Sequence, residues 1–394
     1  MKRIVFIGLL LFAGALFAQD SKVTTGVMKI ESGKFSEGVD AIKTGLAGGV
    51  KEKTVPKAYF YLAKGYAGMM GDTAVMNNTP DVVFEAKEAV KKTKETDTGG
   101  KYTKSLVLVE DNIHRVMFNQ GATYYNNQEY AKALPYLKGA QEMVPDNILY
   151  NLLLGYAQVT LNDTASAIKS LDNTLSIWNS TEAQNRDTSL SNNILSTNLM
   201  LATLYNMYEK DPRKALNVLE KARKDYPTNA DLRNTELSIY QQNPELFEEA
   251  RVKFEKALKD DPKNQNVKLA YAALLTQNGE EEKGLKLYNE VLEVDADNYQ
   301  ANVNVGAFFI NQAVEAQKEY NDTPFSEEAK LAELEKKFLE LLGKAYPYME
   351  KAHEADPENP EWINQLLTIA TSVPEYLGDA KKWKDKQSAL RGGN

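Results

Sequence analysis

The chain has no cysteine and only two histidines, His114 and His353, among its 394 residues. Without cysteine it can have no disulfide bond, no thiolate metal site, no cysteine nucleophile and no lipid anchor on an N-terminal cysteine. Two histidines far apart in the sequence offer little material for metal binding or acid–base chemistry, and we interpret both as surface residues. We therefore expect neither a metal nor a cofactor.

The chain also lacks an excess of positive charge. It carries 47 basic and 55 acidic residues, which give a formal net charge of −8. An acidic surface disfavours nucleic acid and anionic lipid as main partners. Beyond the N-terminal region, no apolar run reaches the roughly 20 residues that a membrane-spanning helix needs. We therefore expect no nucleic-acid partner and no membrane insertion of the mature chain.

The N-terminus has the layout of an export signal. Lys2 and Arg3 precede an apolar run over 4–17, and polar sequence follows Ala18. This order of basic, apolar and polar segments is typical of a cleaved secretory signal. We predict that residues 1–18 are a signal peptide and that the mature chain is periplasmic, either free or associated with an outer-membrane complex. The exact cleavage bond stays open, because Leu16 is larger than the small residue preferred at the −3 position before the cut.

A pattern of small, large and small residues recurs along the chain, often with a proline after it. Ala133, Leu137 and Ala140 form one copy. Small residues at a fixed position allow two helices to approach closely, and the large residue fills the space beside them. The small residue that opens each copy serves as a marker of the repeat, and the eight markers are Gly38, Ala86, Ala133, Ala167, Ala215, Ala250, Gly284 and Ala345.

The markers and their spacing resemble the tetratricopeptide repeat (TPR) family, whose period is 34 residues. Ala167 lies 34 residues after Ala133, and Gly284 lies 34 residues after Ala250. The resemblance implies an all-α fold: a right-handed superhelix of about eight helix–turn–helix units with a capping helix pair at the C-terminus. Several repeats depart from the family by having Asn at its aromatic fourth position, and these residues are Asn151, Asn198, Asn234 and Asn302.

The same comparison divides the chain into four parts. Residues 1–18 are the predicted signal peptide, and residues 19–112 are divergent TPR-like repeats. Residues 113–359 are the clearer repeats, with a helical insertion at 311–340. Residues 360–394 form the capping helices, which solenoids need for a polar end.

Enzyme motifs occur only as fragments. The sequence Lys43-Thr44-Gly45 and the Ser166–Lys169 segment match pieces of the penicillin-binding-protein signature, but in reversed order. Paired carboxylates are followed by lysines one helical turn later, as expected for solvated helix faces. The sequence therefore predicts no enzyme activity and no catalytic residue.

In TPR proteins the first helix of each repeat lines a concave groove. Carried onto this sequence, the resemblance implies a partner-binding groove with aromatic, amide and charged side chains. Such a groove suits an extended peptide, because amides pair with its backbone and rings cover its side chains. The predicted groove residues are Phe60, Tyr61, Lys64, Arg115, Phe118, Asn119, Tyr125, Leu152, Tyr156, Asn206, Asn304 and Asn311.

Three functions remain open from the sequence. The leading prediction is a non-enzymatic scaffold of the cell envelope that binds a partner protein or peptide segment. The second is a glycan-binding module of an outer-membrane uptake system, against which the missing lipid-anchor cysteine counts. The third is an exported helical enzyme, for which no residues can be named. A fold alone does not decide among them, and the sequence leaves the oligomeric state open.

Overall fold

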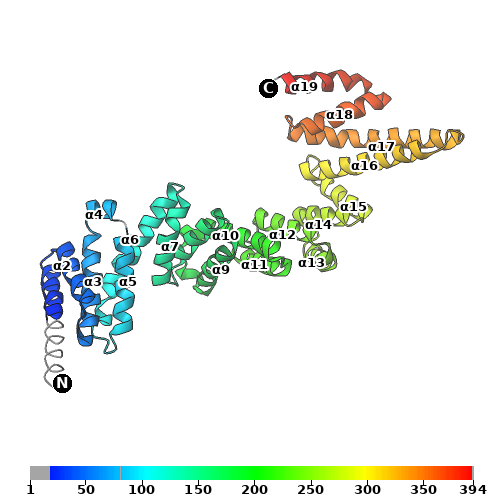
Figure 1. Cartoon of the computed structure of the whole chain (residues 1–394). Helices are drawn as coiled ribbons and strands as arrows, with labels where there is room; N and C mark the ends of the chain where they lie inside the picture. Colours follow the sequence, from blue (N-terminus) through cyan, green and yellow to red (C-terminus); the bar gives the residue numbers. More distant parts are fainter. Residues whose placement is uncertain (1–17, 80, 393–394) are drawn as a thin grey trace. The chain divides into compact units, whose positions relative to one another are not determined.

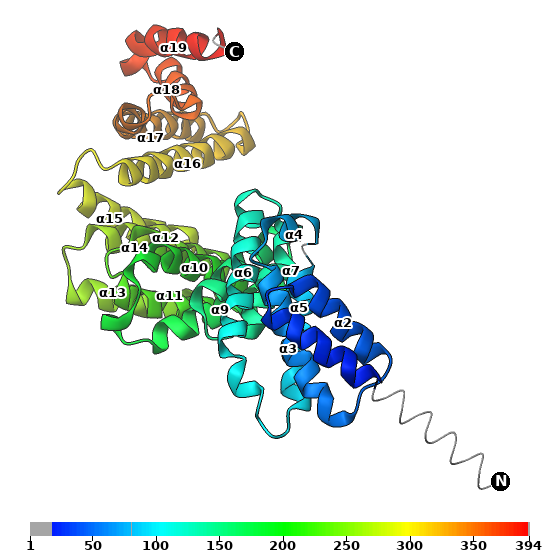
Figure 2. The same cartoon turned by 90° about the vertical axis from the view of Figure 1, so that its left-hand side faces the viewer.

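The computed structural model describes residues 18–79 and 81–392, and within these ranges every regular element is a helix. Apart from Ala18, the predicted signal peptide lies outside the described residues. The chain forms two compact units, the first ending at Lys210 and the second beginning at Asp211. Each unit is a row of antiparallel helix pairs, coloured blue to green and green to red in Figures 1 and 2.

The first unit begins with a helix over 18–31. This helix pairs with α2. The next pairs are α3 with α5, α6 with α7, and α8 with α9, and α4 is a short insertion between α3 and α5. The helices are α2 (Phe35–Ala47), α3 (Val55–Met69), α4 (Thr73–Asn78), α5 (Val82–Thr96), α6 (Val107–Asn126), α7 (Tyr130–Met143), α8 (Ile148–Thr160), α9 (Thr164–Ser180) and α10 (Ser191–Leu204), which continues as a π-helix (Tyr205–Glu209).

The second unit continues the same alternation of first and second helices and ends in a helix pair. Its helices are α11 (Pro212–Asp225), α12 (Ala230–Gln242), α13 (Phe247–Asp260), α14 (Gln265–Gln277), α15 (Glu281–Leu292), α16 (Tyr299–Asp322), α17 (Glu328–Ala355), α18 (Pro360–Ser372) and α19 (Ala380–Gly392). No helix among the described residues is long and apolar enough to cross a membrane.

The eight sequence markers all lie in second helices and are all buried. The six alanines among them have no exposed surface. A Cβ atom added to Gly284 would lie 2.8 Å from the carbonyl oxygen of Ala272 on the preceding helix. Such a distance leaves no room for a side chain, so the small residues allow the close approach that the pattern predicted. The predicted all-α repeat fold is confirmed.

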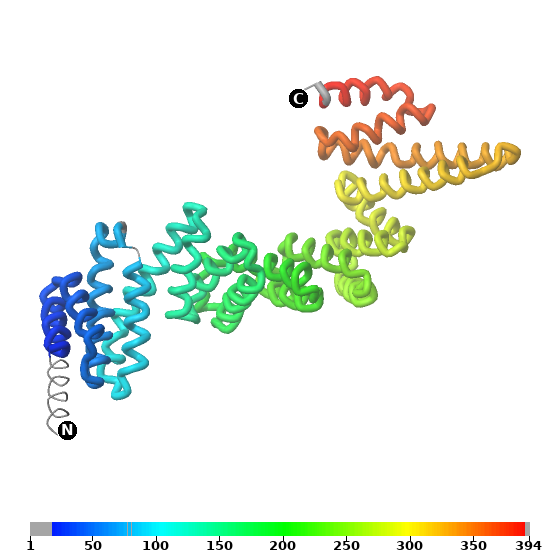
Figure 3. The backbone as a smooth tube through the Cα atoms, viewed as in Figure 1, coloured from blue at the N-terminus to red at the C-terminus, as the bar shows by residue number. Residues whose placement is uncertain are grey.

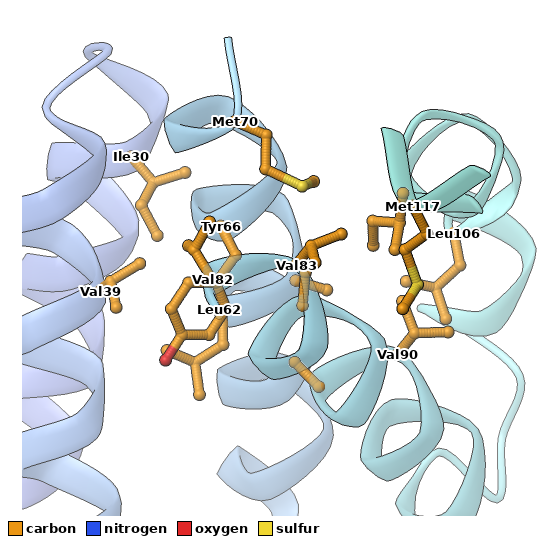
Figure 4. Close-up of a cluster of buried hydrophobic side chains, with 14 of the residues drawn as sticks. Ile30, Val39, Leu62, Tyr66, Met70, Val82, Val83, Val90, Leu106 and Met117 are labelled. Carbon is orange, nitrogen blue, oxygen red and sulfur yellow. The ribbon is translucent and has the colours of Figure 1, made fainter. Parts of the chain in front are cut away.

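The core of the first unit runs continuously between successive helix pairs. Ile30 and Val39 of the first pair meet Leu62 and Tyr66 of α3, and Val83 of α5 packs on the far side (Figure 4). Each of these side chains is at most 5% exposed. A helix pair alone could not bury these faces, so each repeat depends on its neighbours.

Asparagines begin five of the first helices. Each accepts a hydrogen bond from a backbone N–H in the first turn, which satisfies a donor that has no partner inside the helix. These N-cap residues are Asn147, Asn229, Asn264, Asn298 and Asn359.

The predicted asparagines at the fourth position behave in two ways. Asn151 and Asn302 are at most 2% exposed, and each donates to a carbonyl of the preceding turn and to the carbonyl of the N-cap residue. Asn198 is also buried. Asn234 is exposed. The residue that lies four positions after the N-cap Asn229 is Arg233. The assignment of Asn234 to the fourth position was therefore wrong by one residue.

The helices α16 and α17 are much longer than their neighbours, with 24 and 28 residues against 13 and 12 in α14 and α15. They run side by side and extend past one end of α18 (Figure 3). Residues 311–340 form the distal part of this hairpin. Phe325, in its turn, is 90% exposed.

The C-terminal helix docks through an aromatic cluster. Trp383 of α19 is 1% exposed, and its indole N–H donates to the hydroxyl of Tyr346 on α17 at 2.9 Å. His353 lies edge-on to the same indole and is only 5% exposed. The interpretation of His353 as a surface residue was therefore wrong, because α19 covers it.

Candidate interaction surface

The first helices of successive repeats are neighbours in the first unit. The helix α3 contacts α6, and α6 contacts α8. Most of the predicted groove residues lie on these three helices, so the structure places them on adjoining elements. Asn304 and Asn311 belong to α16 of the second unit. The predicted set is thus divided between the two units.

The residues of α3 form an aromatic and charged cluster. The rings of Phe60 and Tyr61 meet edge to face, with centroids 5.1 Å apart, and Phe60 also packs on Tyr102. The Lys64 ammonium lies 2.8 Å from a carboxylate oxygen of Glu31. Lys64 and the Tyr61 hydroxyl together hold the pKa of Glu31 below its usual value, because both stabilise the charged form. Phe60, Tyr61 and Lys64 are half-buried, so the cluster is held by its neighbours and still reaches solvent.

Of the predicted groove residues on α6, some pack against neighbouring side chains and others are exposed. Phe118 stacks on Tyr150 of α8, with centroids 4.5 Å apart. The Tyr150 hydroxyl is 2.8 Å from Nδ1 of His114, whose pKa is lowered by burial. Arg115 is exposed and pairs with Asp111 one turn earlier.

Four other predicted residues are less available to a partner. Tyr125 is half-buried against Tyr130. Leu152 is 5% and Asn206 is 8% exposed. The Tyr156 hydroxyl donates to the carbonyl of Asn193 at 2.9 Å. These side chains hold neighbouring helices together more than they face solvent.

Sequence reasoning missed the exposed apolar residues on the first helices, two of which are leucines in the first unit. Leu108, in the first turn of α6, is 82% exposed, and Leu149, in the first turn of α8, is 40% exposed. Leu108 and Arg115 are seven residues apart and therefore share one face of α6, and exposed Asn119 lies one turn further along it. Leucines outside the positions that the repeat uses for packing were the signal that could have found them.

In the second unit the predicted residues are two asparagines on α16. The amide of Asn304 donates to the carbonyl of Gln300 at 2.7 Å, and Asn311 is exposed. Over the described ranges, no group of three histidine, aspartate or glutamate residues is placed to hold a metal ion.

Stacked helix pairs with buried small residues and exposed first helices define the chain as a helical-repeat protein of the solenoid class. A family model described as Tetratricopeptide repeat matches residues 118–178, and a second model with the same description matches residues 245–303. The chain is a TPR repeat protein. No curated protein gives a significant sequence match to it.

Several solved structures are similar in fold. YrrB, a TPR protein with an unusual peptide-binding site, is 17% identical, with a TM-score of 0.34 over 51% of this chain and 95% of its own. The C-terminal part of a TPR protein from Cytophaga hutchinsonii is 15% identical, with a TM-score of 0.42 over 70% and 96%. The TPR domain of P58(IPK) is 14% identical, with a TM-score of 0.30 over 90% and 98%.

Proposed function

We propose that the chain is an exported, non-enzymatic scaffold of the cell envelope. It binds a segment of a partner protein on the first helices of its first unit. TPR repeats generally serve protein–protein interaction, and neither family match is to an enzyme. The predicted signal peptide supports a periplasmic location.

The observation that carries this proposal is the exposed face of α6. Leu108, Arg115 and Asn119 place an apolar, a charged and an amide side chain along one helix face. Phe118 and Tyr150, stacked beneath, hold α6 against α8, so the face is rigid before a partner arrives. A preformed surface loses little conformational entropy on binding. An extended segment would place an apolar side chain on Leu108 and pair its backbone with Asn119.

Site-specific photo-crosslinking in the native cell envelope tests this proposal. A photoreactive residue replaces Asn119, and the matched control replaces Asn179, an exposed asparagine on the second helix α9. We expect one dominant cross-linked envelope protein from position 119 and none from position 179. The cross-link should be lost with Leu108→Glu and kept with Val252→Glu, since Val252 is 66% exposed on the second helix α13.

Equal cross-linking from positions 119 and 179 would contradict the proposed surface. Retention on a glycan array, without any protein partner, would favour the glycan-binding alternative. Location is tested separately, by cell fractionation and by the mass of the mature N-terminus. A mature chain that retains residues 1–18 would contradict the predicted cleavage.

A further inference from the structure

A hollow of about 690 Å³ lies in the first unit, between α7 and α9 and above α8. Its floor is formed by Asn151, Leu154 and Gln158, which share one face of α8 because they are three and four residues apart. Leu152 and Tyr156 lie on another face of the same helix. The hollow is therefore separate from the predicted groove, and its volume is in the range of ligand sites, about 300–1,000 Å³.

The hollow exists because α9 carries small side chains. Ser170 lies three residues after the marker Ala167 and lines the hollow. At the same offset from their own markers, α7 has Tyr136, α15 has Leu287 and α17 has Tyr348, whereas α2 and α5 have alanines. The walls are completed by Leu134, Lys138 and Gln141 of α7 and by Asp163, Ser166, Lys169, Asp172, Asn173 and Ser176 of α9 or its N-cap.

A buried amide at the floor has unused hydrogen-bonding capacity. Gln158 is 6% exposed, and its Oε1 accepts a hydrogen bond from the Ser170 hydroxyl at 2.7 Å. Its Nε2 has no acceptor among the described residues. This nitrogen is not among the fully buried polar atoms that lack a partner, so it reaches the solvent of the hollow and is free to donate to a ligand acceptor.

The amides on the walls offer the complementary groups. Gln141 and Asn173 each donate to Oδ1 of Asn151, at 3.3 and 2.9 Å, which leaves their own carbonyl oxygens without a donor among the described residues. Donors and acceptors thus line the same hollow. A peptide group needs both, because it has one N–H and one C=O. No aromatic ring lines the hollow, which disfavours a sugar.

Two carboxylates and two ammonium groups line the hollow, and only the ammonium groups lack a partner among the described residues. Asp163 caps α9 by accepting from the backbone N–H of Ser166, and Asp172 accepts from the hydroxyl of Tyr205. Lys138 of α7 and Lys169 of α9 are exposed and have no ion pair among the described residues. Because they stand on facing walls, both ammonium groups can reach one ligand.

We propose that this hollow, which we name the α7–α9 groove, binds an extended peptide segment with an acidic side chain. A carbonyl of the segment accepts from Nε2 of Gln158, and its N–H groups donate to Gln141 and Asn173. Its carboxylate pairs with Lys138 and Lys169. The partner is thus recognised on the side of the second helices, independently of the first-helix surface.

An array of synthetic nonapeptides with acidic, neutral and basic members tests the α7–α9 groove on the purified full chain. Ser170→Leu fills the hollow with a residue that α15 already has at this position. Ala165→Leu is the matched control, because Ala165 is exposed on α9 outside the hollow. The paired changes Lys138→Glu and Lys169→Glu reverse the charge of both walls.

We expect the wild-type chain and Ala165→Leu to retain acidic nonapeptides, and Ser170→Leu to weaken their binding at least tenfold. The lysine pair variant should prefer basic peptides. Circular dichroism and the melting temperature show whether Ser170→Leu has kept its fold. If it has not, the peptide preference of the lysine pair variant decides whether the proposal holds. The proposal is overturned if no peptide binds at millimolar concentration. It is also overturned if folded Ser170→Leu binds as the wild type does, or if neutral oligosaccharides bind in place of peptides.

Discussion

Two junctions between repeats, one in each unit, are built alike but use different polar groups. In the first unit, Asn151 of α8 accepts from Gln141 of the preceding second helix and from Asn173 of the following one. In the second unit, Glu236 of α12 pairs with Arg223 of α11 and with Lys253 of α13. We name these the amide junction and the ionic junction.

The two junctions share one repeat position and differ at the others. Gln141 and Arg223 both lie eight residues after their markers, Ala133 and Ala215. In each case a nearly inaccessible side chain of a first helix bridges two second helices. Asn151 lies four residues after the N-cap Asn147, whereas Glu236 lies seven after the N-cap Asn229. The comparison teaches that a first helix can bridge its two neighbouring second helices from different positions, with either neutral amides or charges.

The largest effect is expected from Gly155→Leu. It places in α8, the first helix of the amide junction, the residue that α12 has at the same distance from its N-cap. Gly155 lies eight residues after the N-cap Asn147, and Leu237 lies eight after Asn229. A Cβ at Gly155 would already lie 2.5 Å from a methyl carbon of Leu171. Gly155→Leu should therefore separate α8 from α9 and lower the free energy of unfolding by about 3 kcal/mol, at the upper end of overpacking costs.

Thermal unfolding measures this change, with Gly155→Ala as the milder control. Hydrogen exchange should place the loss of protection in α8 and α9. An unchanged melting temperature for Gly155→Leu would refute the close contact.

The next largest effect is expected at the ionic junction. The Glu236 side chain is 4% exposed, while those of Arg223 and Lys253 are 32% and 40% exposed. Glu236→Ala removes hydrogen bonds to charged groups, and partial solvation of the two cations limits the loss to about 2 kcal/mol. Urea unfolding at low and high salt measures it. The wild type should lose part of this stabilisation at 1 M NaCl, whereas Glu236→Ala should not.

The sequence predicted the helix pairs but not every register within them. Small residues mark the second helices because only they allow close approach, and all eight markers are buried. Asn234 was misplaced because a 3₁₀ turn, Pro244–Leu246, adds one residue between the N-cap Asn229 and the marker Ala250. Counting back from the marker gives Asn234, and counting forward from the cap gives Arg233.

The candidate surfaces were harder to predict, because exposure depends on contacts distant in sequence. Phe118 is an aromatic residue of the kind expected in a binding groove, yet Tyr150 stacks on one face of its ring. Leu108 looks like a core residue and is 82% exposed. The α7–α9 groove is lined by a serine at a position where α7, α15 and α17 have large residues and α2 and α5 have alanines, which no local motif reports.

A smaller effect is expected from deleting the bridge of the amide junction. Asn151→Ala removes donors to two carbonyls and the acceptor for Gln141 and Asn173. The carbonyl of Pro145 keeps a donor in Asn173, so the loss should be about 1 kcal/mol. Unlike that of Glu236→Ala, its cost should not change with salt, because no charge is lost. A cost that falls at 1 M NaCl would show that the two junctions do not differ as their chemistry predicts.

The smallest effect concerns a third junction, where α19 docks on α17. Nε2 of His353 lies 2.6 Å from the ammonium of Lys386, which can only donate, so the folded state holds a neutral imidazole. Burial lowers the pKa of His353, as do Lys386 and Lys382 of α19, and these outweigh Glu354 of α17 and Asp356 at its C-cap.

Because the folded pKa lies below the unfolded value of about 6.5, the unfolded chain binds the proton more tightly. The docking of α19 should therefore weaken as pH falls below about 6.5 and continue to weaken until the folded pKa is passed. Hydrogen exchange of α19 between pH 7.5 and 5 measures this, and His353→Gln should remove the dependence. Equal protection of α19 across this range in the wild type would show that His353 is protonated without cost, and that its contact with Lys386 does not hold the helix in place.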